Sequence, residues 1–113
     1  METIKNPCKS YAYIGFAMRA GKFRIGSNAI DTLKRAKLMI VCNSISENSL
    51  KSAKKQAEKF GCKLFMTGKD KLEDVTHKEN AKVMAITDKE LASAIINDKD
   101  KDFTEIISGE KNG

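Results

Sequence analysis

The sequence has no tryptophan, one proline and one histidine, and no apolar run that approaches the length of a membrane-spanning helix. Its cysteines, Cys8, Cys42 and Cys62, are an odd number without CxxC spacing, which argues against a disulfide framework. The segment after Met1 lacks the apolar region of a secretion signal. These absences favour a protein of the reducing cytoplasm that does not associate with membranes.

The residue combinations of common catalytic sites are also missing. The single histidine, His77, stands in a polar stretch and is interpreted as a solvated loop residue. No HxxE or Cys/His spacing predicts a metal site. Thr67-Gly68-Lys69 is only a fragment of a phosphate-binding loop, and there is no GxGxxG sequence. We therefore expect a protein that is not an enzyme and that binds neither a cofactor nor a metal.

The charge is distributed unevenly along the chain. Residues 1–63 contain 13 Lys and Arg against 4 Asp and Glu, a net charge of +9. Residues 64–113 contain 8 against 11, a net charge of −3. This polarity favours a polyanionic partner on one side of the molecule, and solvated, lysine-rich helices are the structural alternative.

Helical and extended patterns alternate along the sequence. The predicted strands are 23–25, 38–42, 63–66 and 82–87, and the predicted helices are 11–20, 27–36, 46–60, 70–75 and 88–97. Such alternation predicts an α/β fold with a parallel or mixed sheet covered on both faces. We expect residues 1–98 to form one domain. Residues 99–113 are expected to be a charged extension of the last helix that frays into a flexible tail.

Two neighbouring features favour nucleic-acid binding. Gly26-Ser27-Asn28 stands at a predicted helix start, where free backbone N–H groups and the helix dipole suit a phosphate or a base edge. An ordinary N-cap is the structural alternative. The basic residues just before it are Arg19, Lys22 and Arg24. They are candidates for phosphate contacts, or are simply solvated.

The predicted helix 46–60 has a third basic feature, a face of four lysines. These are Lys51, Lys54, Lys55 and Lys59. We interpret this face as solvated, because it is expected to lie apart from the other two features.

Several segments resemble one known family. They are Ile14-Gly15-Phe16-Ala17-Met18-Arg19-Ala20-Gly21-Lys22, Gly26, Leu38 to Cys42, Ser46-Glu47-Asn48 and Ala85-Ile86-Thr87-Asp88. Together they resemble the bacterial YlxQ-like proteins. These belong to the ribosomal protein superfamily that includes the archaeal kink-turn binder "seven-Ae" and the eukaryotic "thirty-e" protein. The resemblance covers roughly residues 10 to 97.

The resemblance implies an α/β/α sandwich around a four-stranded mixed sheet. It also implies RNA binding at the start of the second helix and at a nearby loop before the last strand, which here contains Thr76, His77 and Lys78. Family members recognise kink-turns, sharply bent RNA elements with tandem G·A pairs beside a bulge. RNA of this kind is recognised by its shape and by splayed nucleotides.

The family pattern Gly-x-Asn-Glu-x-x-Lys falls on residues 26–32. Gly26 and Asn28 agree with it, whereas Ala29 replaces the acidic residue and Thr32 the basic one. In the loop before the last strand, many relatives have Leu-Gly…Gly-Lys where this chain has residues 72–78 without glycine. Lys34 or Arg24 are candidates to compensate for the missing basic contact.

These features predict a non-catalytic, monomeric, cytoplasmic protein that binds structured RNA, either ribosomal RNA or a messenger leader. Asn28 would bind base edges, the backbone of Gly26 and Ser27 would approach the RNA closely, and the basic residues would hold phosphates. The alternative is that the same fold has lost its RNA site. It would then act through a protein partner, the ribosome or a translation factor.

Overall fold

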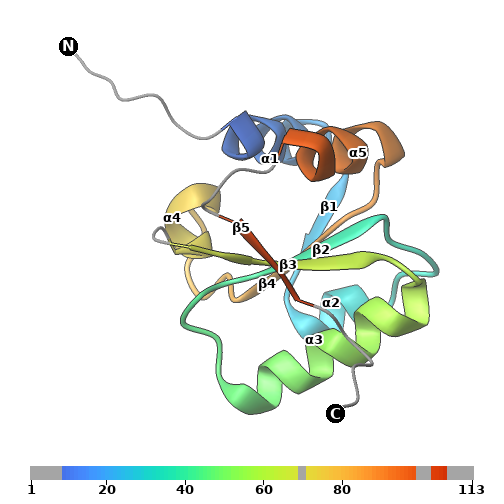
Figure 1. The fold of residues 1–113 in the computed structure, drawn as a ribbon, viewed down its shortest axis with the longest axis vertical. Helices are drawn as coiled ribbons and strands as arrows, with labels where there is room; N and C mark the ends of the chain where they lie inside the picture. The colour runs from blue at the N-terminus through green and yellow to red at the C-terminus, as the bar shows by residue number, and fades with distance from the viewer. Residues whose placement is uncertain (1–8, 69–70, 99–102, 107–113) are drawn as a thin grey trace.

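The computed structural model describes residues 9–68, 71–98 and 103–106 (Figure 1). The helices are α1 (Lys9–Arg19), α2 (Ser27–Asp31), α3 (Glu47–Phe60), α4 (Leu72–Thr76) and α5 (Lys89–Asp98). The strands are β1 (Phe23–Ile25), β2 (Leu38–Val41), β3 (Lys63–Thr67), β4 (Val83–Ile86) and β5 (Phe103–Ile106). The strands form one sheet in the order β1-β4-β2-β3-β5. Because β2 and β3 are parallel and the other pairs are antiparallel, the sheet is mixed.

The central strand β2 shows how the sequence produces two hydrophobic cores. Successive side chains of a strand point to opposite faces of the sheet. Leu38 and Ile40 therefore join the core beneath α1, α4 and α5, whereas Met39 and Val41 join the core beneath α2 and α3. All four residues are buried, which confirms the prediction of a strand covered on both faces. In Figure 1 the two groups of helices lie on opposite sides of the sheet.

Helix boundaries follow their capping residues at most of the predicted positions. Ser46 caps α3 by accepting a hydrogen bond from the Ser49 N–H at 3.2 Å, and Gly61 ends the helix in the left-handed conformation at φ 69°. The Asp88 carboxylate accepts from the Leu91 N–H at 2.9 Å at the start of α5. Gly21, with φ 71°, follows α1 as predicted.

Helix α2 is shorter than predicted. The expected helix included Leu33 and Ala36, but α2 ends at Asp31. The Thr32 hydroxyl donates to the Ala29 carbonyl at 2.6 Å, and the Leu33 N–H donates to Ile30 three residues back. These tight contacts satisfy the terminal carbonyls without another helical turn.

The prediction of a four-stranded sheet is wrong, because a fifth strand, β5, pairs with β3. Residues 103–106 were expected to continue the last helix, and the apolar spacing of Phe103 and Ile106 does suit a helix. In the structure Phe103 is buried against Phe65, with ring centroids 6.1 Å apart. Lys63 and Glu105 form an ion pair at 3.1 Å across the two strands. Long-range pairing and burial therefore override the local pattern, and the sheet extends past residue 98.

The rest of the predicted extension and tail, residues 99–102 and 107–113, lies outside the described residues. Over the part of the chain that the structure describes, no helix is both long enough and apolar enough to cross a membrane.

Candidate nucleic-acid interface

The start of α2 is formed by a glycine in a conformation that other residues rarely adopt. Gly26 has φ 99° and ψ 141°, and no side chain caps the helix. A Cβ placed on Gly26 would meet no heavy atom within 4 Å, so the backbone here is not covered by neighbouring groups. The next two residues start the helix, Ser27 half-buried and Asn28 exposed. The first turn of a helix has N–H groups without intrahelical partners, and here they adjoin uncovered backbone.

The loop before β4 lies at the same end of the sheet. The Gly26 N–H donates to the Val83 carbonyl at 3.0 Å, which joins the start of α2 to the first residue of β4. The sheet register continues this contact, with Ile25 opposite Met84. The start of α2 is therefore joined to the beginning of β4. Thr76, His77 and Lys78 lie earlier in the loop, at the end of α4, which packs on the other side of the sheet from α2.

The loop has a fixed shape without glycine. His77 and Asn80 adopt the left-handed conformation at φ 59° and 60°. Thr76 is buried; its hydroxyl donates to the Leu72 carbonyl at 3.0 Å and accepts from the Lys78 N–H at 3.3 Å. The buried Thr76 therefore stabilises the loop conformation through its hydroxyl, whereas His77 and Lys78 are exposed.

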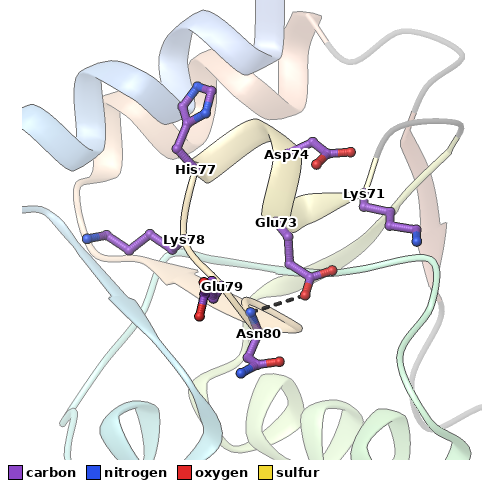
Figure 2. Close-up of a pocket in the computed structure, with 7 residues that line it drawn as sticks. All are labelled: Lys71, Glu73, Asp74, His77, Lys78, Glu79 and Asn80. Atoms are coloured by element: carbon purple, nitrogen blue, oxygen red, sulfur yellow. Dashed lines mark hydrogen bonds between the residues drawn. The ribbon is translucent and has the colours of Figure 1, made fainter.

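A shallow hollow lies on the outer side of α4 and this loop (Figure 2). Its lining residues are Lys71, Glu73, Asp74, His77, Lys78, Glu79 and Asn80. Both lysines and carboxylates line it. This mixture does not select for one sign of ligand charge.

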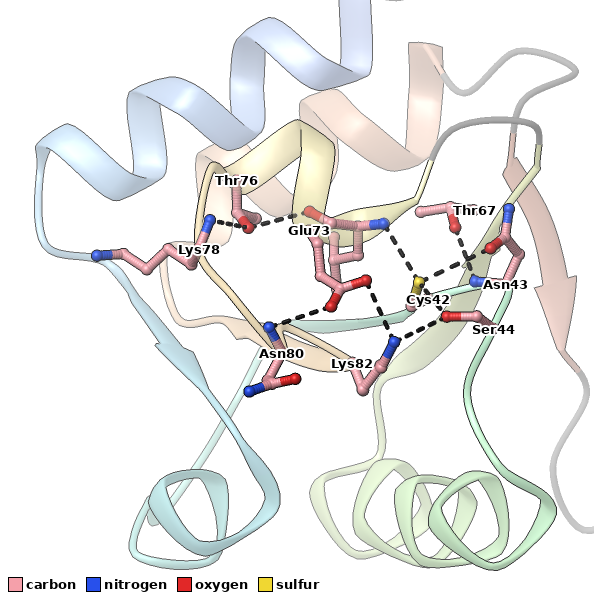
Figure 3. A network of polar contacts seen from close by, with 10 residues as sticks. Cys42, Asn43, Ser44, Thr67, Glu73, Thr76, Lys78, Asn80 and Lys82 are labelled. Carbon is pink, nitrogen blue, oxygen red and sulfur yellow. Dashed lines mark hydrogen bonds and ion pairs between the residues drawn. The ribbon is translucent and has the colours of Figure 1, made fainter.

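Glu73 is held in a network of polar contacts beneath the loop (Figure 3). Its carboxylate accepts from the Asn80 N–H at 3.1 Å and pairs with the Lys82 ammonium at 3.2 Å. The same ammonium donates to the Ser44 hydroxyl at 2.9 Å. The negative charge of Glu73 is thus compensated within the protein.

Cys42 is buried at the centre of this network. Its Sγ accepts from the Leu72 N–H at 3.4 Å and lies 3.2 Å from the Ser44 hydroxyl. Burial acts to raise the pKa of the Cys42 thiol, but the hydrogen bonds and the positive charge of Lys82 outweigh burial, so the pKa is below its usual value. Cys42 was predicted to be a small core residue, and it lies in the core beneath α1, α4 and α5.

The predicted basic residues extend along β1 away from the α2 start. Arg24 lies within β1, whereas Lys22 precedes the strand and Gly26 follows it. About 13 Å of extended chain separates Lys22 from Gly26. All three cations, Arg19 included, are exposed. The structure therefore distributes the basic residues from the end of α1 into the edge strand β1 and does not cluster them around the start of α2. Because Phe23 and Ile25 pack on the core beneath α1, Arg24 between them points to the other face of the sheet.

The remaining predicted residues lie around the C-terminal end of α2. Ala29 is half-buried, and the hydroxyl of Thr32 is engaged with the Ala29 carbonyl. Lys34 is exposed in the segment that joins α2 to β2. A lysine here lies beyond the end of the helix opposite to Gly26.

Three of the four lysines on the face of α3 that was interpreted as solvated, Lys51, Lys55 and Lys59, are exposed. The opposite, buried face of α3 contacts α2. Gln56 of α3 is buried, and its Nε2 donates to the Ser27 carbonyl at 3.2 Å and to the Asp31 carboxylate at 2.8 Å. Helix α3 is therefore in direct contact with both ends of α2. The sequence shows Gln56 on the apolar face of a helix, which is the one signal that marks it as a packing contact.

Phe16 is an exposed surface residue that was not among the predicted site residues. The Arg19 guanidinium lies 5.1 Å from the centroid of its ring. Its position off the apolar face of α1, away from Ile14 and Ala17, was visible in the helical spacing.

Among the described residues, no three His, Cys, Asp or Glu side chains are grouped so that they would hold a metal ion.

Comparisons with known proteins bear on the fold alone. No model of a known protein family matches the sequence, and no protein of curated function is significantly similar to it. The solved structure of "a protein with unknown function" from Bacillus halodurans is similar, with a TM-score of 0.69 over 80% of this chain and 96% of that chain. The two sequences are 16% identical. The chain thus shares its mixed α/β fold with this bacterial protein.

Proposed function

We propose that this protein is a non-catalytic, cytoplasmic RNA-binding protein that recognises structured, kink-turn-like RNA, with a role on or near the ribosome. We propose further that its helices and sheet form the three-layer α/β/α arrangement of the YlxQ-like proteins, extended here by a fifth strand. The observation that carries the proposal is the direct contact between the glycine-initiated start of α2 and the first residue of β4. That contact holds the start of α2 against the strand into which the second segment, the loop containing Thr76, His77 and Lys78, leads.

The start of α2 supplies the groups that read RNA. Asn28 is exposed in the first turn, and its amide both donates and accepts hydrogen bonds, so it is suited to base edges. Gly26 has no side chain to keep a nucleotide away from the backbone, and the space where a Cβ would stand is open, with no heavy atom within 4 Å. A rigid surface of this kind recognises RNA by shape and by splayed nucleotides.

The loop at the end of α4 supplies a second contact with a fixed shape. Lys78 is exposed, and Figure 3 shows its side chain directed out of the loop, away from α4. The pairing of Glu73 with Lys82 reduces the repulsion that a free carboxylate would exert on a phosphate. The loop therefore remains compatible with an anionic ligand despite its acidic residues.

Replacement of Asn28 by alanine tests this assignment. The Asn28→Ala variant is expected to bind a kink-turn RNA about tenfold or more weakly than the wild type, because a contact to a base edge is lost. Asn48→Ala is the matched control, since Asn48 is also an exposed asparagine in the first turn of a helix. Equal losses in the two variants, or none in either, would show that the start of α2 is not the RNA site.

A second candidate function is a protein-interaction module in translation that has lost its RNA site. Two observations favour it. Ala29 is half-buried and apolar, and the Thr32 hydroxyl bonds to the Ala29 carbonyl, so neither offers the polar contact that the family pattern has there. A pull-down with and without ribonuclease distinguishes the two functions. Partners that persist after digestion favour protein contacts, whereas partners that are lost favour RNA.

A further inference from the structure

An exposed aromatic ring stands apart from both segments of the proposed RNA site. Phe16, in the last two turns of α1, has 46% of its surface exposed. It is the only large apolar side chain that is exposed among the side chains the structure describes. A phenylalanine in this position has no role in the core beneath α1.

The ring is paired with a cation and lies near a second aromatic ring. The Arg19 guanidinium lies 5.1 Å from the Phe16 ring centroid, within cation–π distance. On the same helix, the Tyr13 ring lies 6.3 Å away at a tilt of 58°. Gly15 adds no side chain beside the pair, and a Cβ there would come within 4.0 Å of the Arg19 guanidinium. The result is a small exposed surface made of one aromatic ring and one guanidinium.

This surface adjoins the start of β1, where two further cations follow in the chain. The Lys22 N–H donates to the Ala17 carbonyl at 2.8 Å, so Lys22 follows directly on the last turn of α1. Strand β1 is an edge strand, and Arg24 is exposed within it. The cations Arg19, Lys22 and Arg24 therefore lie between Phe16 and Gly26 along the chain, and Arg24 points to the other face of the edge strand from α1. An RNA strand that runs from the start of α2 toward Phe16 would pass Arg24 first, then Lys22 and then Arg19.

We infer that Phe16 and Arg19 form a stacking platform for an unpaired base in a single-stranded extension of the bound RNA. The inference rests on the proposed function. Unpaired bases stack on aromatic rings and on guanidinium planes, and such stacking tolerates any base. The cations between the platform and α2 give the connecting phosphates their counter-charges. RNA with a short single-stranded extension on the kink-turn thus binds more tightly than the kink-turn alone.

The absence of tryptophan from the sequence allows a direct test. In a Phe16→Trp variant the new indole is the only one in the protein, and a base stacked on it quenches its fluorescence. We expect quenching by a kink-turn RNA with a single-stranded extension and little quenching by the same kink-turn without it. The Phe16→Leu variant, whose exposed position leaves the fold intact, is expected to lose about tenfold in affinity for the extended RNA only.

A matched control comes from a similar pair at the end of α3. The Lys59 ammonium lies 5.8 Å from the Phe60 ring centroid, and Lys59 is exposed. Lys59→Gln and Arg19→Gln each remove one cation from an aromatic ring. The platform requires that Arg19→Gln weakens binding of the extended RNA clearly more than Lys59→Gln does.

The outcomes separate the platform from the proposed function. If the wild type binds both RNAs with equal affinity and Phe16→Leu binds as the wild type does, the platform is wrong and the proposed function stands. If the wild type binds neither RNA, the proposed function fails, and a single-stranded oligonucleotide alone then decides the platform by quenching the indole fluorescence of Phe16→Trp or leaving it unchanged. A protein partner that survives ribonuclease and needs Phe16 overturns the platform in favour of protein docking.

Discussion

Gly26 has the most restrictive backbone geometry in the proposed site. At φ 99° and ψ 141° a β-carbon is disfavoured by its own backbone, even though the surrounding space is open. The cost of a substitution there is therefore conformational and does not come from a clash. Gly15 is the opposite case, because it lies inside α1 and a Cβ there meets only the Arg19 guanidinium, at 4.0 Å.

We predict opposite effects of alanine at these two glycines. Gly26→Ala is expected to lower the free energy of unfolding by about 1–3 kcal/mol, because alanine is strained at this φ and ψ. Gly15→Ala is expected to raise it by about 0.5–1 kcal/mol through helix propensity. Chemical denaturation measures both. Destabilisation by Gly15→Ala as large as that by Gly26→Ala would contradict the backbone explanation.

The two described cysteines differ in the sign of their pKa shifts. Burial raises the pKa of the half-buried Cys62 thiol to about 11, whereas the pKa of Cys42 is lowered. A raised pKa in the folded state means that the unfolded chain releases its proton first as the pH rises. The stability contributed by the neutral Cys62 thiol is therefore present below pH 9 and is lost between pH 9 and 11.

The raised pKa of Cys62 predicts how the stability of the protein depends on pH. Between pH 9 and 11 the unfolding free energy of the wild type is expected to fall relative to that of Cys62→Ala. The fall is at most about 2 kcal/mol, because the thiol is partly exposed and solvent weakens the effect of burial. Denaturation curves of both proteins at several pH values give the difference. A constant difference across this range would show that the folded and unfolded states have the same Cys62 pKa.

At the scale of whole elements, the position of α2 depends on α3. Helix α2 has five residues, too few to be stable by itself. Gln56 holds both of its ends through Ser27 and Asp31, and its Oε1 is buried without a hydrogen-bond partner. A buried polar atom without a partner carries a free-energy cost. Gln56 bears this cost at Oε1 while its Nε2 fixes the position of α2.

We therefore predict that Gln56 influences RNA binding without contacting RNA. Gln56→Ala is expected to lower the unfolding free energy by about 1–2 kcal/mol and to weaken kink-turn binding, since it frees α2 from α3. Ser52→Ala, an exposed change one turn earlier in α3, is the control and should affect neither. If Gln56→Ala destabilises the fold but binds RNA with wild-type affinity, the link between α3 and the site is absent.

Strand β5 shows why part of the fold could not be predicted. Residues 103–106 contain apolar residues at a helical spacing, and only pairing with β3 and packing on Phe65 make them a strand. Neither contact is visible in the local sequence. By contrast, β2 and α3 were predicted correctly, because an unbroken apolar run and a capped amphipathic pattern are themselves local signals.

The contribution of β5 can be measured with one buried and one exposed residue. Phe103→Ala is expected to lower the unfolding free energy by about 3 kcal/mol, because Phe103 is 5% exposed and fills space against Phe65. Thr104→Ala, an exposed neighbour on the same strand, should change it by less than about 0.5 kcal/mol. A small effect of Phe103→Ala would show that β5 is not an integral part of the sheet.

At the scale of the whole molecule, the fold determines how the predicted site residues are arranged. The sequence predicted the residues of the candidate site but not their arrangement. Gly26 is joined to the first residue of β4, whereas the cations expected near Gly26 extend along the chain from the end of α1 into β1. The contact between α2 and α3 was not predicted, since it depends on which helices share a face of the sheet. Such tertiary neighbours cannot be derived from one sequence pattern.

A positive net charge attracts any RNA. A preference for one RNA over another is therefore what distinguishes specific recognition from nonspecific electrostatic binding. Nonspecific binding weakens steeply as salt rises, and it does so equally for all sequences. Contacts to base edges and to RNA shape persist when phosphate contacts are screened. The proposed site at α2 therefore requires a preference that survives moderate salt.

The most direct test is an electrophoretic shift titration of the wild-type protein at two salt concentrations. The two RNAs are a kink-turn and the same RNA with its tandem G·A pairs replaced. We predict that the kink-turn binds at least about tenfold more tightly, and that this ratio is retained when the salt concentration is raised about fourfold. Equal affinities for the two RNAs, both falling in parallel as salt rises, would contradict the proposal and leave only nonspecific attraction to the basic half of the chain.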